Sequence, residues 1–95
     1  MMMMPRKPFV IWGAGIRGQI ALDFIGKDKV AAFVDQDIAV QKQMPDELTV
    51  MTFDDFISQG HKEYIIISPR DSKSIVELLD RNNISAYSLL DEIIY

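Results

Sequence analysis

The sequence predicts an α/β fold in which one parallel sheet is covered by helices on both faces, and three observations support this. Residues 9–12 and 30–34 are apolar at every position, which is typical of strands buried on both faces of a parallel sheet. Residues 16–25, between them, have helical periodicity. A third apolar run, 64–67, also leads into a helical pattern. Two buried strands joined by one helix are parallel and have a right-handed connection.

The connection between the first strand and the first helix is rich in glycine. Gly13, Gly15 and Gly18 form a G-x-G-x-x-G pattern. We expect Gly13 to allow a tight turn, Gly15 to let a pyrophosphate approach the backbone, and Gly18 to let the helix pack closely. The first N–H groups of a helix lack intrahelical partners and attract anions. The predicted phosphate contacts are Gly13, Ala14, Gly15, Ile16, Arg17 and Gly18.

Two of the predicted contacts have alternative interpretations. Asp35 ends the second apolar run, 20 positions after Gly15, where an acid can bind a ribose hydroxyl. It can equally be a turn aspartate that accepts hydrogen bonds from nearby N–H groups. Arg17 can reach a phosphate, or it can be a solvated side chain of the first helical turn. With no ligand, the whole glycine pattern would be only a tight turn.

The first helix is expected to end at a left-handed cap on Gly26. Ile16, Ile20 and Phe24 are spaced to form one apolar stripe along this helix. Ala21 and Ile25 lie beside the stripe. Residues 36–47 lack the pattern of a second crossover helix, so we expect an irregular loop there with at most a short helical turn. Residues 48–51 then form a short edge strand.

The second half of the chain adds two strands and three helical segments. Thr52 and Asp55 fit a capping box that begins a short helix ending before Gly60. After the strand at 64–67, Ser68 is expected to cap a helix with Pro69 at its first position. That helix reaches about residue 83, and a strand at 84–89 and a turn or helix at 91–95 follow.

These elements predict a three-layer, Rossmann-like fold whose five-stranded, mainly parallel sheet has the order 3-2-1-4-5. A ligand is expected where connections from the first and fourth strands leave in opposite directions. Ser68 and Arg70 follow the fourth strand there, and Gln36 follows Asp35 after the second. These three residues are therefore further candidate contacts, although Ser68 is better explained as a helix cap.

Composition restricts the class of protein. A net charge of −4 argues against nucleic acid or an anionic membrane as the main partner. The absence of cysteine excludes disulfides and thiolate metal sites, and we predict no metal. Apolar runs are too short to span a membrane, and residues 1–8 do not resemble a secretory signal. We expect one cytoplasmic domain over residues 1–95, with 1–7 as a disordered terminus.

Catalytic residues are not predicted. His61, the single histidine, lies in a polar turn and is expected to be solvated, and Trp12 is expected in the core. A nucleophile with an adjacent base is not apparent, so we expect the chain to be non-catalytic by itself.

Residues 9–37 resemble the start of small Rossmann-like domains in bacterial surface-polysaccharide enzymes. These include the N-terminal domain of sugar O-acyltransferases, nucleotide-binding domains of capsule-biosynthesis sugar dehydratases, and tail domains of some glycosyltransferases. The matching residues are Ile11, Gly13, Ala14, Gly15 and Ala32 to Asp35. The resemblance implies binding of a nucleotide or nucleotide-sugar through Gly13, Gly15 and Asp35.

Three functional hypotheses follow. The first is a nucleotide-binding module for sugar or surface-polysaccharide biosynthesis. Its ligand would be NAD, a nucleotide-sugar or another nucleotide with an unphosphorylated ribose, because Asp35 would repel a 2′-phosphate. The second is the NAD-binding half of an oxidoreductase or dehydratase. The third is an interaction domain that keeps the fold without a ligand. A second copy of the chain or a covalently linked catalytic domain is compatible with the sequence as a protein partner.

Overall fold

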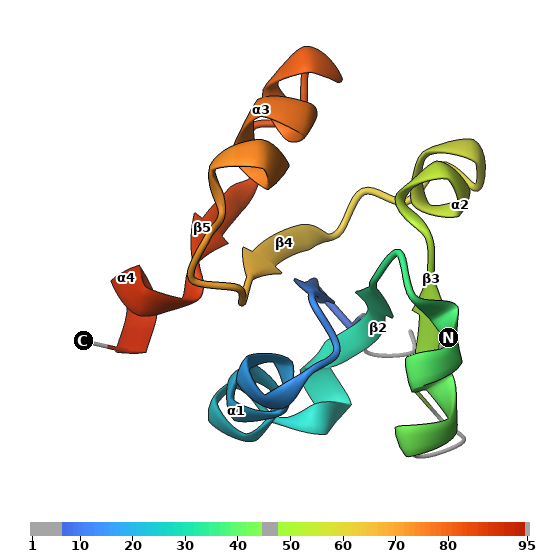
Figure 1. Cartoon of the computed structure of the whole chain (residues 1–95), viewed down its shortest axis with the longest axis vertical. Coiled ribbons are helices and arrows are strands. Elements are labelled where there is room, and N and C mark those ends of the chain that lie inside the picture. Colours follow the sequence, from blue (N-terminus) through green and yellow to red (C-terminus); the bar gives the residue numbers. More distant parts are fainter. Residues whose placement is uncertain (1–6, 45–47, 95) are drawn as a thin grey trace, which may run out of the picture.

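A computed structural model describes residues 7–44 and 48–94, so the predicted disordered terminus lies outside the described residues except for Lys7. The fold is α/β, with a five-stranded parallel sheet of order β3-β2-β1-β4-β5 (Figure 1). The predicted fold class and strand order are therefore confirmed. The strands are β1 (Phe9–Trp12), β2 (Val30–Val34), β3 (Thr49–Met51), β4 (Tyr64–Ile67) and β5 (Tyr87–Leu89).

The central strand β1 is in register with both neighbours at its carboxyl end. Trp12 lies opposite Val34 of β2 and Ile67 of β4. Because the three strands end level with one another, the residues that follow them meet at one edge of the sheet. Gly13, Asp35 and Ser68 are thereby brought together from distant parts of the sequence.

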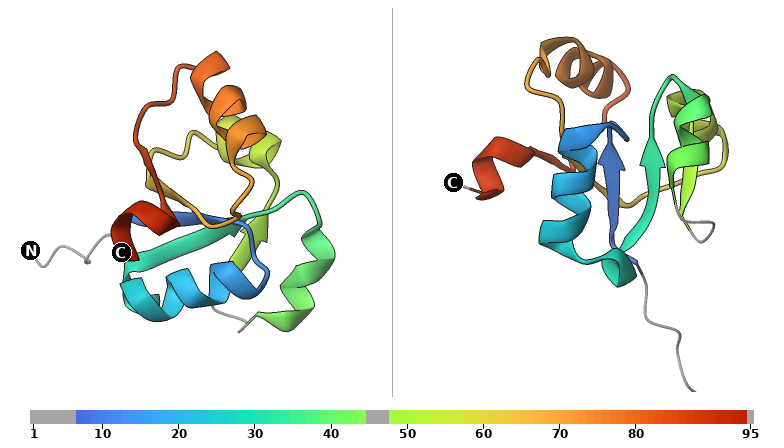
Figure 2. Two further views of the ribbon diagram at one scale, coloured as in Figure 1. Left: turned by 60° about the vertical axis from the view of Figure 1, so that its left-hand side comes forward. Right: turned by 60° about the horizontal axis from the view of Figure 1, so that its bottom comes forward.

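Helices cover both faces of the sheet (Figure 2). On one face, α1 (Ile16–Ile25) and α4 (Leu90–Ile94) share a core with residues of the 3-10 helix η2 (Ile38–Gln43). On the other face, α2 (Phe53–Ser58) and α3 (Lys73–Arg81) enclose a second core. Side chains of β1 and β4 enter the two cores alternately, and β2 also contributes to both cores, which explains why these strands are largely apolar.

The face of α1 that packs on the sheet differs from the predicted one. Ile16, Ile20 and Phe24 are 82%, 45% and 59% exposed, whereas the buried residues of α1 are Gly18, Ala21 and Leu22. The reason lies at Gly18, where a Cβ atom would be 2.0 Å from the carbonyl oxygen of Gly13. This close contact fixes the rotation of the helix, and the bulky stripe then points outward.

The helix ends as predicted at Gly26, but not with a left-handed cap. Gly26 has φ +99° and ψ 129°, so only the positive φ agrees with the expectation. Its N–H donates to the carbonyl of Leu22, and the chain continues into the 3-10 helix η1 (Lys27–Lys29) before β2 begins.

The loop predicted after β2 contains a helical turn, η2, whose start is capped by Asp37. Gln41 fastens this turn to the edge of the sheet: its side-chain amide donates to the carbonyl of Leu48 and accepts from the N–H of Val50, both at 2.7 Å. The rest of the predicted loop at 45–47 lies outside the described residues. The short strand β3 at the sheet edge agrees with the prediction.

One of the two hydrogen bonds of the predicted capping box before α2 is present: the hydroxyl of Thr52 accepts a hydrogen bond from the N–H of Asp55. The predicted start of the next helix is wrong. Ser68 does not cap α3, which begins at Lys73 after Ser72. Ser68 instead continues the pairing of β4, since its N–H donates to the carbonyl of Trp12 at 3.0 Å. The last strand is also shorter than predicted and begins at Tyr87.

The terminal turn or helix predicted at 91–95 is present as α4, although Tyr95 is outside the described residues. Across 7–44 and 48–94, no helix is both long enough and apolar enough to cross a bilayer.

Candidate functional site

Ser68, the residue after β4, holds in place the glycine loop that follows β1 (residues 13–18). Gly13 has φ +95°, and a Cβ atom there would lie 2.6 Å from the Ser68 hydroxyl, so both the turn and the close approach require glycine. Ser68 is 1% exposed, and its hydroxyl donates to the carbonyl of Trp12 at 2.7 Å and lies 3.2 Å from that of Gly13. The side chain therefore fixes the loop and faces away from solvent.

The start of α1 is open. Gly15 is the N-cap residue, with φ −79°, and a Cβ atom placed on it would have no neighbour within 4 Å. In the described part of the chain, the N–H groups of Gly15, Ile16 and Arg17 have no hydrogen-bond acceptor. They form the positive end of a ten-residue helix, where an anion is favoured.

Asp35 links the ends of β1 and β2. One carboxylate oxygen accepts the N–H of Ala14 and the other that of Asp37, both at 2.9 Å. This is the arrangement expected of a turn aspartate. A carboxylate has about four acceptor positions, so Asp35 retains capacity for a ribose hydroxyl. Ala14 makes its backbone contact with Asp35 and so does not offer that N–H to a phosphate.

Arg17 is engaged by other parts of the protein and is not a freely solvated side chain, while its contact with a phosphate stays a prediction. Its Nε donates to the carbonyl of Ser68 at 2.5 Å, and its Nη2 forms an ion pair with Asp91 in the first turn of α4. The side chain thus crosses from α1 to the ends of β4 and β5. The distant ion pair was not visible in the sequence, because it depends on the short connection between β5 and α4.

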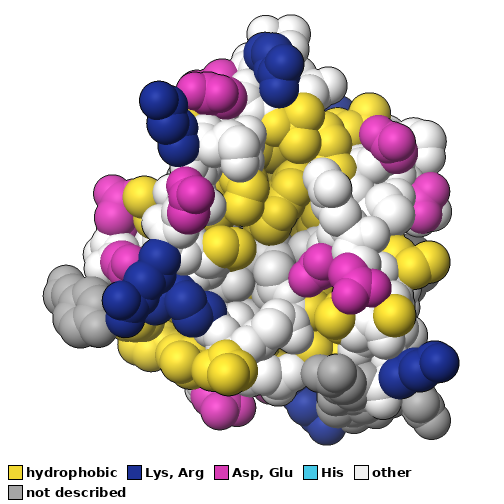
Figure 3. Space-filling view, viewed as in Figure 1, with side chains coloured by type: hydrophobic (Ala, Val, Ile, Leu, Met, Phe, Trp, Pro, Cys, Tyr) yellow, Lys and Arg dark blue, Asp and Glu magenta, His cyan; other side chains and the backbone are white. Residues whose placement is uncertain are grey.

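Two hollows meet above the glycine loop. One, of about 330 Å³, is lined by the loop itself and by Arg17. The other, of about 590 Å³, is a groove beside α3 with apolar walls from Trp12, Ile75 and Leu78. Gly13, Asp35 and Pro69 line both, so the hollows are adjacent. Figure 3 shows hydrophobic side chains gathered beside α3 on the side that faces α2.

The groove brings in residues that the sequence did not identify as a site. Ile75 and Leu78 fit the apolar pattern of a core helix, yet only Leu79 of α3 is fully buried. Polar side chains on the groove are those of Asp35, Gln36, Ser74 and Arg81, of which Asp35 and Gln36 were predicted. Arg70 was also predicted as a contact, but it is exposed and lines neither hollow.

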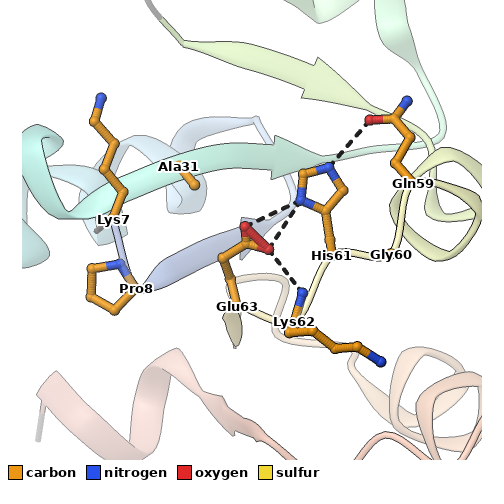
Figure 4. A pocket seen from close by; sticks show the side chains of 8 residues that line it. All are labelled: Lys7, Pro8, Ala31, Gln59, Gly60, His61, Lys62 and Glu63. Atoms are coloured by element: carbon orange, nitrogen blue, oxygen red, sulfur yellow. Dashed lines mark hydrogen bonds and ion pairs between the residues drawn. The ribbon is translucent and has the colours of Figure 1, made fainter. Parts of the chain in front are cut away.

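His61 lies at the opposite edge of the sheet, beside a separate cavity of about 610 Å³ (Figure 4). Its Nδ1 is 3.0 Å from the Glu63 carboxylate, its Nε2 is 3.2 Å from the Gln59 side-chain oxygen, and its ring stacks on Phe56. The histidine is therefore held in place rather than solvated as predicted. These contacts fasten the connection between α2 and β4.

Within the described residues, no group of three or more histidine, aspartate or glutamate side chains is arranged to hold a metal ion. No protein-family model, curated protein or solved structure matches the chain.

Proposed function

We propose that the chain is a nucleotide-binding module whose ligand lies along the carboxyl edge of the sheet. The observation that carries the proposal is that two hollows adjoin above the glycine loop. At one, the N–H groups that start α1 have no acceptor among the described residues, and the other is a groove lined by both apolar and polar side chains. A nucleotide has the matching two parts, an anionic phosphate and a flat, largely apolar base.

The phosphate would occupy the hollow over Gly15, where the backbone is open and the helix dipole favours negative charge. This placement makes the acidic net charge of the whole chain compatible with an anionic ligand, because the attraction comes from backbone N–H groups close to the phosphate. It also explains why glycine stands at a position with a negative φ and open surroundings.

The nucleoside would extend into the groove beside α3, with its ribose near Asp35 and Gln36. Asp35 lines both the groove and the loop hollow, and Gln36 lines the groove. The base would rest against Ile75 and Leu78. A carboxylate at the ribose favours a free 2′-hydroxyl over a 2′-phosphate.

The proposed biological setting is sugar or surface-polysaccharide biosynthesis, and it is supported by the resemblance of residues 9–37. In this proposal the module binds a nucleotide for a reaction that another domain or protein performs. Cytoplasmic localisation is part of the same proposal, since nucleotides are used there.

The proposal is tested by measuring the thermal stability of the chain with ADP, UDP, GDP, CDP, NAD and nucleotide-sugars. A ligand present at a hundredfold its Kd raises the free energy of unfolding by about 2.7 kcal/mol. We expect at least one unphosphorylated-ribose nucleotide to stabilise the chain, and NADP to stabilise it less than NAD. If every nucleotide leaves the unfolding transition unchanged at millimolar concentration, the proposal is wrong.

A further inference from the structure

We infer that the exposed apolar stripe of α1, formed by Ile16, Ile20 and Phe24, is the contact surface of a weak, antiparallel dimer of this chain. The inference goes beyond nucleotide binding and does not depend on it. The stripe faces outward on a helix whose other side packs on the sheet. These residues are half of the six large hydrophobic residues that are exposed in the described part of the chain.

The exposed area of the stripe is suited to a small dimer interface. Ile16, Ile20 and Phe24 are 82%, 45% and 59% exposed. If a large residue exposes about 200 Å² when it is free, the stripe presents about 370 Å², and two copies present about 740 Å². This matches the apolar share, roughly two-thirds, of an interface of about 1,200 Å² in total, the lower end of the size typical of specific complexes. Such an interface gives a weak dimer, so the chain is monomeric at low micromolar concentration.

The spacing of the stripe fits pairing with a copy of itself. Ile16 and Phe24 lie four residues before and four residues after Ile20. A two-fold axis beside Ile20 therefore places it against Ile20 of the partner subunit, and places Ile16 against Phe24 of the partner subunit. Antiparallel pairing also brings opposite ends of the two helix dipoles together. Since Ile16 is the one stripe residue that lines the loop hollow, the two hollows stay at opposite ends of the interface.

Charges around the stripe favour a second copy over an anionic partner. Residues 16–29, which include α1 and η1, carry three basic and two acidic side chains, a net charge of +1. Because the whole chain has a net charge of −4, the remainder carries −5. Two copies that meet through α1 therefore make contact at a part of the chain that is not acidic, where repulsion between them is low. A net charge of +1 is too small to attract nucleic acid or an anionic bilayer strongly.

Cysteine cross-linking tests the pairing directly. The sequence has no cysteine, so an introduced cysteine can form a disulfide only with that of a second copy. Ile20→Cys should give a covalent dimer on mild oxidation at submillimolar concentration. Ile57→Cys is the matched control and should stay monomeric, because Ile57 is 43% exposed on α2, on the opposite face of the sheet.

Two further cysteine variants test the direction of the pairing. Ile16→Cys and Phe24→Cys should each link poorly alone and should link to each other when they are mixed, because antiparallel pairing brings the unlike positions together. If Ile16→Cys links to itself as efficiently as Ile20→Cys does, the antiparallel arrangement is wrong.

Sedimentation equilibrium measures the same contact without a disulfide. We expect the wild-type chain to dimerise at submillimolar concentration, Phe24→Lys to raise the dimer Kd at least tenfold, and Ile57→Lys to leave it unchanged. A lysine in the last turn of α1 is compatible with the helix dipole, and circular dichroism checks that the variant folds.

A wild-type chain that stays monomeric at millimolar concentration would overturn the inference, and so would a dimer that Phe24→Lys leaves unchanged. A monomeric chain that sediments with vesicles of phosphatidylcholine and phosphatidylglycerol would also overturn it, because the stripe would then belong to a lipid surface. Nucleotide binding is measured separately and stands or falls on its own result.

Discussion

At the scale of single residues, Gly15 and Gly18 are alike in sequence but differ in surroundings. Gly15 has open space where its Cβ would be, while Gly18 is pressed against the carbonyl of Gly13. The same motif therefore contains one glycine that leaves room for a ligand and one that leaves room for the protein's own backbone.

Gly15→Val should weaken nucleotide binding sharply, because its methyl groups would occupy the space proposed for the phosphate oxygens. The negative φ at Gly15 tolerates valine, and the loss of a favourable N-cap costs only about 1 kcal/mol. Calorimetric titration gives the affinity, and urea denaturation gives the free energy of unfolding.

Gly18→Val is the comparison variant, because it should lower the stability of the fold and not act directly on the ligand. A Cβ only 2.0 Å from a backbone oxygen forces α1 away from the loop, so the free energy of unfolding should fall by at least ~1–3 kcal/mol. Wild-type affinity in Gly15→Val would show that the ligand lies elsewhere or that the loop is only a turn.

For Asp35, the sequence leaves two roles open, a contact with a ribose and a role in the turn. Its spacing from Gly15 is equally suitable for a ribose contact and for a turn, and the hydrogen bonds to Ala14 and Asp37 establish the turn role. One consequence is that Asp35→Ala would disturb the loop as well as any ribose contact. Asp35→Asn keeps an acceptor for only one of the two N–H groups, so the free energy of unfolding has to be measured beside the affinity for either substitution.

At the scale of the elements, α1 has apolar residues on two faces, and the sequence alone did not distinguish them. The face carrying small residues packs on the sheet, because only it permits the close approach at Gly18. Helical periodicity detects an apolar stripe, but it does not say which of two stripes can come close enough to the strand.

We predict that Leu22→Ala lowers the free energy of unfolding by about 2–5 kcal/mol, as for other buried leucines. Phe24→Ala, on the exposed stripe of the same helix, should change it by less than ~0.5 kcal/mol. Both variants are compared by denaturant titration. A larger loss in Phe24→Ala than in Leu22→Ala would mean that the helix packs on the stripe predicted from the sequence.

The contact between β5 and α3 should make stability depend on pH. The hydroxyl of Tyr87 donates to the carboxylate of Asp80 at 3.1 Å. Desolvation, followed by the hydrogen bond and the charge of Asp80, raises the pKa of Tyr87 above its ordinary value of 10.0. The folded chain therefore holds this proton more tightly than the unfolded chain, so the stabilisation is present below pH 10 and is lost as pH rises through the folded-state pKa.

Tyr87→Phe removes the titrating group and should flatten this part of the profile. The measurement is the urea midpoint of both proteins between pH 8 and pH 11. A wild-type midpoint that falls no faster than that of Tyr87→Phe over this range would contradict the assignment. Other tyrosines and lysines titrate in both proteins, so only the difference between the two profiles is informative.

At the scale of the whole molecule, the strand order could be predicted because it depends on features that the sequence states directly. The topology is defined by the fully apolar strands, by the helix between the first two of them, and by the segment before β3, which lacks the pattern of a long helix. The groove could not be predicted in the same way. It depends on how far α3 stands from the sheet, and that follows from the delayed start of α3 at Lys73 and from Ser68 remaining with β4.

The same arrangement separates the proposed site from the best-placed acid–base pair. His61 and Glu63 lie at the amino edge of the sheet, whereas the glycine loop and the groove lie at the carboxyl edge. Among the described residues that line the two site hollows, the ionisable side chains are Arg17, Asp35 and Arg81. The guanidinium groups of the arginines offer only N–H donors, and both oxygens of Asp35 already accept backbone N–H groups.

We therefore predict that the purified chain binds a nucleotide without converting it. Incubation with NAD or NADH and a series of nucleotide-sugars should give no change in nicotinamide absorbance and no new sugar product by mass spectrometry. General acid–base catalysis needs a titrating group within hydrogen-bond reach of the reacting atom, and the carboxylate that the described residues place on the two hollows, that of Asp35, is engaged by the loop. Hydride transfer that disappears in Asp35→Asn, but persists in His61→Gln, would instead identify the chain as the NAD-binding half of an oxidoreductase.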